Sequence, residues 1–420
     1  MRKPKLFLHI FFLVIVLVLG SSSAFFSSIS MGATAAPENI TLTWSADPKT
    51  TQTITWRTAS VTVGGQVQYA EAVSGHLFPD HAITVTAGVE ALHTNIGEMA
   101  IHSSILTGLK PNTRYVYRVG GTEGWSQPRY FTTAPAITQN FTFLVFGDSQ
   151  SINYNVWGTT LRQAYQANQQ AAFFTNVGDL VDVGQDYSQW NSWFSAGKGV
   201  VDTIPVMPVT GNHEFYTAQR RQFALPVLFT SQIKLPLNGP ENLMGQVYSF
   251  DYGDVHFVML NSQELEERAF VPDMLERQKT WLENDLQSTR KKWKLGFIHR
   301  PLYNNKPGAG EISISKAFGP IFDKYHVDVV FTGHDHAYAR TYPLCGGMVT
   351  ASTEQGTIYV AAGRSGTKTY QNLLAKDWHE FFYDPQDEPN YLVVTVSPTA
   401  LQVKAVKQSG GLIDNWTIYK

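Results

Sequence analysis

Side chains that can bind metal ions occur at five points of the chain, each directly after an apolar run rich in β-branched or aromatic residues. They are Asp148 and Gln150 in Gly147-Asp148-Ser149-Gln150, Asp179 in Gly178-Asp179, Asn212 in Gly211-Asn212-His213-Glu214, His299 after Lys294-Leu295-Gly296-Phe297-Ile298, and His334 and His336 in Gly333-His334-Asp335-His336. Carboxylate, imidazole and amide ligands that follow several strand ends are what a two-metal hydrolytic centre requires. The set therefore predicts such a centre, with phosphate-ester hydrolysis as its chemistry.

Each motif taken alone has a plainer interpretation. A Gly-Asp step after a strand more often forms a turn, and a His-x-His pair is as often part of a surface loop. Asparagine is a weak ligand that becomes useful where anionic oxygens and imidazoles already hold the ion. His213, which follows Asn212, is then free to act on a substrate, and Asp335 is expected to support its own loop. The prediction depends on the complete set.

The segment that must position these residues, 140–408, alternates apolar strands with helical segments. Helices are expected near 159–170 and 188–194, and from Asp273 to Lys291 with Asp273 as the N-cap. The alternation predicts an α/β domain whose helices cover a sheet. Strands near 391–396 and 401–406 are expected to close the sheet, and residues 409–420 to form a C-terminal tail.

Residues 37–134 have an all-β texture, in which short polar and apolar alternations such as Thr53-Ile54-Thr55-Trp56 are separated by turn-rich segments. This pattern predicts a β-sandwich. The segment Leu106 to Tyr117 resembles the end of a fibronectin type III repeat. A Pro- and Thr-containing joint, 132–140, separates this domain from the α/β domain.

The N-terminal residues 1–35 have the pattern of a secretory signal peptide. Arg2, Lys3 and Lys5 precede the apolar run Leu6 to Leu19, and Ala33-Thr34-Ala35 is a small-x-small cleavage pattern. A secreted or extracellular protein is therefore expected, with an uncleaved signal anchor as the alternative. No second long apolar run follows, so no stable membrane insertion is expected after cleavage.

Charge and cysteine content exclude other classes. The formal net charge of −2 provides no basic field for nucleic acid, and the single cysteine, Cys345, cannot form an internal disulfide. A small phosphate ester is the expected partner, and the sequence leaves the oligomeric state open.

In their order along the chain, the five motifs resemble those of the calcineurin-like metallophosphoesterase superfamily. With the N-terminal sandwich, the chain from Pro37 onward resembles a secreted purple acid phosphatase. The resemblance implies a metallophosphoesterase β-sandwich flanked by helices, preceded by an all-β fibronectin III-like sandwich, and two metal ions per chain. It implies these roles: Asp148 and His336 bind the first metal, Asp179 bridges both, Asn212, His299 and His334 bind the second, and His213 faces the leaving group.

Two positions depart from the purple enzymes. Asp182 stands where those enzymes place the tyrosine that colours the iron, and Gln150 stands where the wider superfamily has a histidine. If Gln150 ligates through its amide oxygen, the first site is rich in oxygen and favours iron or manganese over zinc. The second site is expected to hold iron, manganese or zinc. An iron-loaded protein without the tyrosine should have no intense visible band.

The expected activity is hydrolysis of phosphate esters by metal-bound hydroxide, most simply as an acid-phosphatase-like phosphomonoesterase. The alternatives are a phosphodiesterase of the same superfamily and a non-catalytic surface-binding protein with a degenerate first metal site. Arg300 and His379 are candidates for substrate binding, although Arg300 could equally stabilise its loop and His379 could serve packing. Glu214 is expected to support the ligands.

Overall fold

The computed structural model describes residues 33–59, 64–73, 78–137, 139–219, 222–308 and 312–420. The segment assigned to a signal peptide, residues 1–35, lies outside the described residues except for its last three. Among the described helices, none combines the length and the apolar character needed to cross a membrane.

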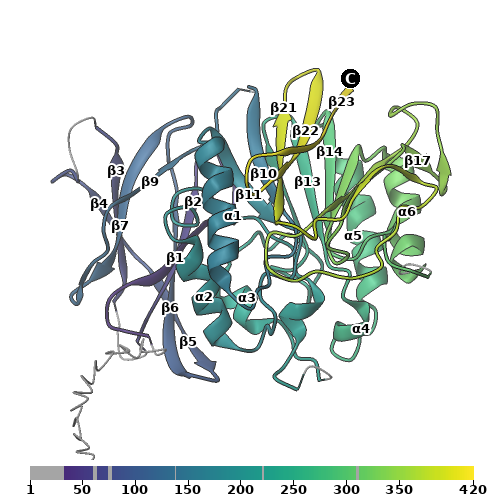
Figure 1. Ribbon diagram of the computed structural model, residues 1–420. Coiled ribbons are helices and arrows are strands. Elements are labelled where there is room, and N and C mark those ends of the chain that lie inside the picture. Colours follow the sequence, from purple (N-terminus) through teal and green to yellow (C-terminus); the bar gives the residue numbers. More distant parts are fainter. Residues whose placement is uncertain (1–32, 60–63, 74–77, 138, 220–221, 309–311) are drawn as a thin grey trace, which may run out of the picture. The chain divides into compact units, whose positions relative to one another are not determined.

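The N-terminal domain is built from two antiparallel sheets (Figure 1), whose strand orders are β1-β2-β6-β5 and β4-β3-β7-β8, with β9 beside β7. The strands are β1 (Glu38–Thr43), β2 (Gln52–Ala59), β3 (Gln66–Glu71), β4 (Ile83–Thr86), β5 (Gly88–Thr94), β6 (Gly97–Leu106), β7 (Arg114–Gly121), β8 (Gly124–Trp125) and β9 (Arg129–Thr132). Aromatic side chains from both sheets, including Trp56, Tyr117 and Phe131, are buried in one cluster. The expected β-sandwich is confirmed.

The second domain contains two larger sheets. One has the order β11-β10-β21-β22-β23 and the other β12-β13-β14-β15-β19-β16-β20. Their strands are β10 (Phe141–Phe146), β11 (Ala171–Asn176), β12 (Tyr248–Tyr252), β13 (Val255–Leu260), β14 (Trp293–Ile298), β15 (Val329–Thr332), β16 (Tyr338–Thr341), β19 (Ile358–Ala362), β20 (His379–Tyr383), β21 (Asn390–Val396), β22 (Ala400–Lys407) and β23 (Leu412–Tyr419); β17 (Leu344–Cys345) and β18 (Met348–Val349) form a separate hairpin. The pairs β10–β11, β13–β14, β14–β15 and β15–β19 are parallel.

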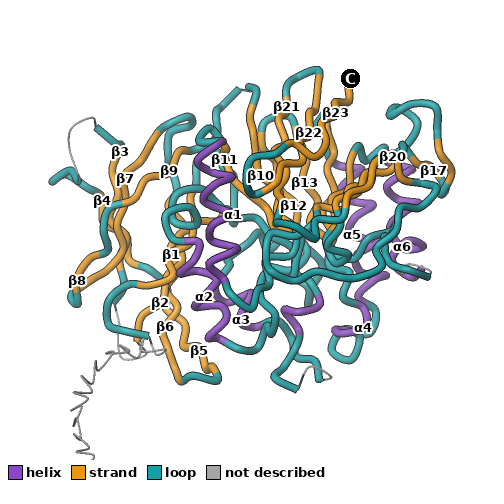
Figure 2. The backbone as a smooth tube through the Cα atoms, viewed as in Figure 1, coloured by secondary structure: helices purple, strands orange, loops and turns teal. Residues whose placement is uncertain are grey.

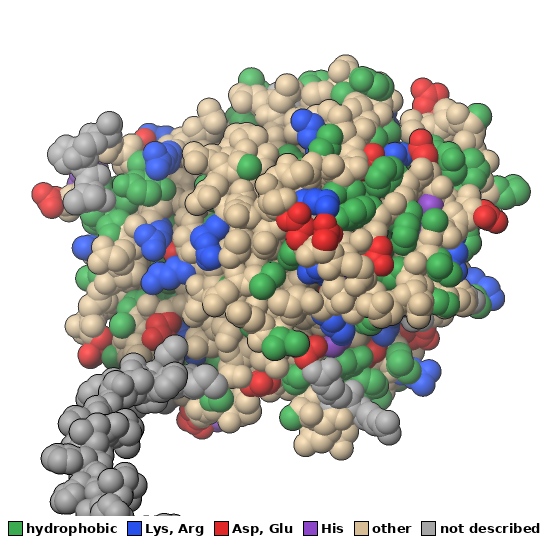
Figure 3. All heavy atoms as spheres, viewed as in Figure 1, with side chains coloured by type: hydrophobic (Ala, Val, Ile, Leu, Met, Phe, Trp, Pro, Cys, Tyr) green, Lys and Arg blue, Asp and Glu red, His purple; other side chains and the backbone are tan. Residues whose placement is uncertain are grey.

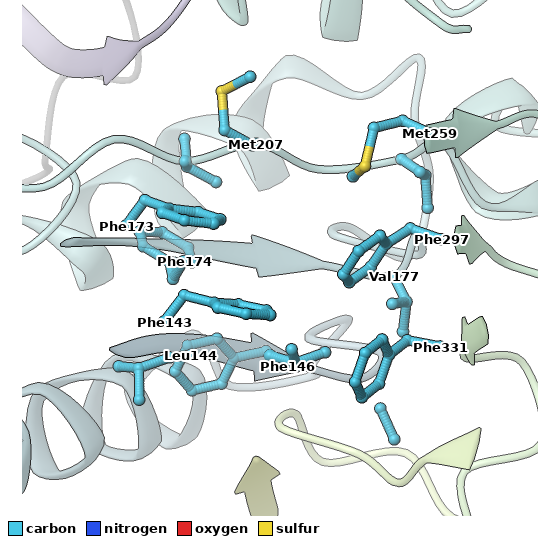
Figure 4. Packing of buried hydrophobic residues seen from close by; sticks show 14 of the residues in the cluster. Phe143, Leu144, Phe146, Phe173, Phe174, Val177, Met207, Met259, Phe297 and Phe331 are labelled. Atoms are coloured by element: carbon cyan, nitrogen blue, oxygen red, sulfur yellow. The ribbon is translucent and has the colours of Figure 1, made fainter. Parts of the chain in front are cut away.

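Aromatic side chains fill the space between these two sheets. The ring of Phe143 stacks on that of Phe173, with 5.0 Å between the ring centres. It also makes an edge-to-face contact with Phe257, which belongs to the other sheet, at a centre-to-centre distance of 5.4 Å. Figure 4 shows Phe143 and Phe173 on one side of this core and Phe297 and Phe331 on the other. Successive side chains of a strand point to opposite faces, so alternate residues of β10, β11, β14 and β15 build a single core. The two sheets form the expected sandwich.

Helices cover the outer faces of the sandwich. On one side lie α1 (Tyr154–Ala167) and α2 (Tyr187–Gly197), where Trp157 stacks on Trp193 at 5.4 Å; on the other lie α5 (Met274–Ser288) and α6 (Ile312–Tyr325) (Figure 1). The short helices are α3 (Val227–Gln232) and α4 (Glu264–Glu267), and Asn212–Phe215 form the 3₁₀ turn η1. The α/β class with flanking helices is confirmed.

Four local predictions need adjustment. The first helix begins at Tyr154, five residues before the expected start, because Asn153 caps it by accepting from the backbone N–H of Asn155. Asp273 occupies the N-cap of α5, but its carboxylate makes no capping hydrogen bond and pairs with Arg277 instead. Residues 409–420 are not a tail, because β23 pairs with β22 along the edge of the sheet.

The fourth adjustment concerns the apolar run before Gly211. Residues 204–210 form no regular strand, since Pro205 and Pro208 lack the N–H groups that a ladder needs. The segment still lies beside β11, where the N–H of Met207 donates to Phe174 O and that of Val209 to Asn176 O. It therefore delivers η1 to the same end of the sheet as a strand would. Figure 2 shows the loops that connect these elements.

Charged side chains of both signs are interspersed on the face drawn in Figure 3. Ion pairs among the described residues include Lys407 with Asp387 and Lys110 with Glu71.

Candidate metal centre

The carboxyl ends of strands from both sheets converge on one site. Asp148 follows β10 and Asp179 follows β11 in one sheet, while His299 follows β14 and the loop with His334 and His336 follows β15 in the other. Asn212 enters from η1. Parallel strands present their carboxyl ends at the same edge of a sheet, so the two packed sheets bring these residues together.

One group of possible ligands consists of Asp179, His299, His334 and Asn212. The Nε2 atom of His299 lies 3.2 Å from Asp179 Oδ2, 3.1 Å from Asn212 Oδ1 and 3.2 Å from His334 Nδ1, and Asn212 Oδ1 is 3.0 Å from His334 Nδ1. His299 Nδ1 already donates to Val177 O. If His299 is neutral, the lone pair of its Nε2 faces the oxygens of Asp179 and Asn212, an arrangement that a cation between these atoms would satisfy.

The second group consists of Asp148, Asp179, His336 and Gln150. His336 Nε2 lies 2.9 Å from Asp148 Oδ2, while His336 Nδ1 donates to Lys368 O at 2.8 Å. The amide nitrogen of Gln150 is 3.2 Å from His336 Nε2 and 3.4 Å from Asp179 Oδ2, and its Oε1 is buried without a hydrogen-bond partner. Rotating this amide by half a turn exchanges its oxygen and nitrogen. All four residues are at least 98% buried.

Asp179 belongs to both groups. Donor atoms of Asp179, His299 and His334 all lie within 4.8 Å of one another, and so do donor atoms of Asp148, Asp179 and His336. The donors are carboxylate, imidazole and amide groups, which suit first-row transition metals. The residues present therefore fit a pair of ions that share Asp179.

Close backbone packing explains two of the glycines in the motifs. A Cβ on Gly333 would lie 2.6 Å from Asp148 Oδ1, and one on Gly211 would lie 2.2 Å from Asp179 Oδ1. Left-handed backbone conformations also occur at Asp179 (φ 54°), His334 (φ 69°) and His336 (φ 60°). Such conformations cost energy in non-glycine residues and cluster at functional sites.

The electrostatics of the site favour a bound cation. Burial by itself raises the pKa of Asp179, but the neighbouring His299 and His213 hold that pKa well below its usual range. Burial lowers the pKa of His299, but Asp179 and Asp148 outweigh it and raise the pKa to about 9. Burial and the charge of Lys306 hold the pKa of His334 well below its usual range. The carboxylates of Asp179 and Asp148 thus favour positive charge at Nε2 of His299, as a bound cation would supply.

Glu214 supports the ligands, as the sequence led us to expect. Its carboxylate accepts the backbone N–H groups of Asp179, Leu180 and Gly211 at 2.9, 2.8 and 2.6 Å. Burial and the nearby charge of Asp179 raise the pKa of Glu214 to about 8. Asp335 also points away from the ligands, because it accepts the N–H of Asn305.

His213 lies beside the ligands without belonging to either group. Its Nδ1 donates to the carbonyl of Asp182 at 2.6 Å, and its Nε2 accepts from Lys368 Nζ at 2.9 Å and lies 3.8 Å from Asp179 Oδ2. Burial lowers the pKa of His213, but Asp179 and the hydrogen bond to Asp182 raise it above its ordinary value. Asp182 contacts the imidazole through its main-chain carbonyl and through its carboxylate, whose Oδ1 lies 3.3 Å from His213 Nδ1.

The structure does not bring Arg300 or His379 into the ligand groups. The guanidinium of Arg300 is buried and makes two 2.8 Å hydrogen bonds to the carboxylate of Glu266, which matches the loop-stabilising alternative. Nδ1 of His379 lies 2.9 Å from Lys376 N and Nε2 lies 3.1 Å from Trp378 Nε1, so both ring nitrogens face groups of the adjoining segment. Both residues serve local structure here.

Four residues at the site carry no recognisable pattern in the sequence. Tyr216 OH accepts from Asn212 Nδ2, the ring of Tyr370 lies 4.5 Å from that of His336, Lys306 donates to His334 O, and Lys368 contacts His213. They come from loops, where neither hydrophobic periodicity nor spacing marks a residue. Only proximity to a predicted ligand could have suggested Tyr216.

Fold and site together define a metallophosphoesterase. Residues 37–133 match the family model "Purple acid Phosphatase, N-terminal domain", and residues 141–338 match "Calcineurin-like phosphoesterase". The chain belongs to the calcineurin-like phosphoesterases and carries the N-terminal domain of the purple acid phosphatases. The family implies a binuclear metal site, which the shared carboxylate of Asp179 fits.

Individual relatives agree with this assignment. Acid phosphatase type 7 of Mus musculus is 28% identical over 358 residues, which cover 79% of this chain and 78% of the relative. A probable inactive purple acid phosphatase 1 of Arabidopsis thaliana is 26% identical over 366 residues, covering 76% of this chain and 58% of that protein. The structure of purple acid phosphatase PPD1 from yellow lupin seeds has the same fold, with a TM-score of 0.77, 23% identity, and coverage of 91% of this chain and 74% of the lupin chain.

Proposed function

We propose that this protein hydrolyses phosphomonoesters at a pair of metal ions. The observation that carries the proposal is the buried carboxylate of Asp179, which belongs to two groups of inward-facing donors at once. When bound, such a pair of ions supplies an activated water and neutralises charge on the phosphoryl group. We assign Asp148, Gln150 and His336 to the first ion, Asn212, His299 and His334 to the second, and Asp179 to both.

His213 is proposed as the residue that assists the leaving group. The hydrogen bond from Nδ1 to Asp182 O fixes the ring so that Nε2 faces the side of the site where Asp179 lies. When Nε2 carries a proton, His213 can transfer it to the ester oxygen as the bond to phosphorus breaks. General acid catalysis of this kind contributes about 10²- to 10⁴-fold.

The types of ligand indicate which metal ions the two groups prefer. The first group contains one imidazole beside two carboxylates and an amide, and this oxygen-rich set favours iron or manganese. The second group adds a further imidazole and suits iron, manganese or zinc.

We also propose that the protein is secreted, on the basis of the charged and apolar pattern of residues 1–35.

The alternative is a non-catalytic binding protein, which the inactive name of one relative and the glutamine at position 150 favour. Elemental analysis of the purified protein, combined with assays on p-nitrophenyl phosphate and bis-p-nitrophenyl phosphate, tests both. Two metal ions per chain and faster hydrolysis of the monoester support the proposal. One metal ion per chain and no turnover of either ester would favour the binding protein, and faster hydrolysis of the diester would favour a phosphodiesterase.

A further inference from the structure

We propose that Lys368 determines substrate class: its ammonium binds a terminal phosphoryl oxygen and thereby selects dianionic phosphomonoesters over phosphodiesters. The inference rests on the function proposed above and adds to it the residue that distinguishes the two ester classes.

Both the backbone and the side chain of Lys368 form hydrogen bonds to residues of the site. Its carbonyl accepts from His336 Nδ1 at 2.8 Å, which fixes the backbone against the first group of ligands. Its side chain crosses to the other part of the site, where Nζ donates to His213 Nε2 at 2.9 Å. Nζ also lies 5.5 Å from the centre of the Tyr370 ring. The ammonium is therefore held next to the imidazole that we assign to the leaving group.

Lys368 also forms no direct ion pair. Among the described residues its ammonium makes no salt bridge to a carboxylate and donates to His213 Nε2, and its charge helps to lower the pKa of Asp179. The second lysine at the same ring differs in this respect. Lys306, 4.2 Å from the centre of the Tyr370 ring, lies 3.5 Å from Asp335 and donates to His334 O. Lys306 is already neutralised within its loop, whereas the half-buried ammonium of Lys368 is available to a bound anion.

The charge and the oxygen atoms of the substrate decide how much this ammonium contributes. A phosphomonoester carries close to two negative charges near neutral pH, spread over three terminal oxygens. A phosphodiester carries a single charge on two terminal oxygens, and its other two oxygens are uncharged ester oxygens. A fixed cation therefore attracts the monoester more strongly, and a charge-assisted hydrogen bond is stronger than a neutral one.

The test compares Lys368→Met, which removes the charge but keeps the length of the side chain, with Lys368→Arg, which keeps the charge. Lys404→Met, on the exposed side of β22, is the matched control. In the metal-loaded proteins, kcat/KM is measured for p-nitrophenyl phosphate and for bis-p-nitrophenyl phosphate. Calorimetry measures the binding of inorganic phosphate, and elemental analysis confirms the metal content.

We expect Lys368→Met to lower kcat/KM for the monoester roughly 10- to 100-fold more than for the diester, the usual effect of one charge-assisted hydrogen bond. Phosphate binding should weaken by a similar factor, while Lys368→Arg and Lys404→Met should keep the preference. Equal losses on both esters, or unchanged phosphate binding, would overturn the inference.

A failure of the proposed function looks different from a failure of this inference. If the unsubstituted, metal-loaded protein hydrolyses neither ester, the phosphoesterase proposal fails, and phosphate binding still tests Lys368. Should Lys368→Met fold poorly, Lys368→Gln removes the charge with a polar side chain, and the same comparison applies.

Discussion

The backbone N–H of His213 donates to Oδ1 of Asp179 at 2.9 Å, while the other oxygen of that carboxylate lies 3.2 Å from His299 Nε2. The residue that joins the two ligand groups therefore also holds the loop that carries His213. Metal binding and the position of the proposed acid are coupled through one side chain, and substitutions can separate the two.

Asp179→Asn is expected to empty both metal sites. The substitution removes the negative charge that the two groups share, and we expect affinity for both ions to fall at least about 100-fold, more than loss of a supporting residue costs. Metal content after dialysis against metal-free buffer measures the effect. Asp273→Asn, at an exposed position on α5, is the control. Two ions retained at unchanged affinity would contradict the shared role.

His213→Ala should separate chemistry from metal binding. We expect turnover of p-nitrophenyl phosphate to fall about 10²- to 10⁴-fold, because the leaving oxygen loses its acid, while metal content stays at two ions per chain. His379→Ala, which removes an imidazole whose contacts are to Lys376 and Trp378, should leave turnover unchanged. Loss of metal from His213→Ala would instead identify His213 as a ligand.

An iron-loaded protein is expected to lack an intense visible absorption band. The resemblance to the purple enzymes places Asp182 at the position of the colour-giving tyrosine, and the tyrosines nearest to the possible ligands do not favour the phenolate form. Burial raises the pKa of Tyr216, and burial together with the charges of Asp179 and Asp148 raises that of Tyr370. An absorption spectrum of the iron form, with iron quantified in the same sample, decides the question; a strong charge-transfer band would refute this ligand set.

Arg300→Met should affect stability more than substrate binding. The substitution leaves the buried carboxylate of Glu266 without its partner, which typically costs about 3–5 kcal/mol of unfolding free energy. Urea unfolding measures the loss, and the double variant Arg300→Met with Glu266→Leu should recover much of it. Arg277→Met, in an exposed ion pair, should have little effect. If Arg300→Met kept its stability and raised KM for the monoester, Arg300 would be a phosphate ligand after all.

His256, which lies away from the site, is expected to make a contribution to the unfolding free energy that depends on pH. Burial lowers the pKa of His256, but hydrogen bonds to Asp251 and Asp285 raise it from 6.5 to about 9 in the folded chain. A pKa raised by folding stabilises the protein fully below the unfolded value and loses its effect as the pH rises through the folded one.

His256→Gln should therefore cost on the order of 2 kcal/mol near pH 6 and much less near pH 10. Unfolding free energies at both pH values, with the exposed His81→Gln as control, measure the difference. An equal cost at both values would show that the charged pairs do not carry the effect.

Much of the site was predictable because its ligands follow regular strands. A strand that ends at Phe146 or Ile298 must release its next residues at the sheet edge, so Asp148 and His299 could be identified from an apolar run and the polar residue after it. The same logic failed for β23. Its residues alternate weakly, and only pairing with β22 reveals that they belong to the sheet.

The sequence by itself indicated an all-β fold followed by an α/β fold, a set of possible metal ligands and the phosphoesterase family, since these depend on residue type and on strand periodicity, which are local properties. The tertiary structure decided which residues face the ligands from distant loops. Arg300 turns to Glu266, whereas Lys368 reaches His213. Such pairings depend on the distances between loops that are far apart in the chain, and those distances exist only once the two sheets have packed against each other.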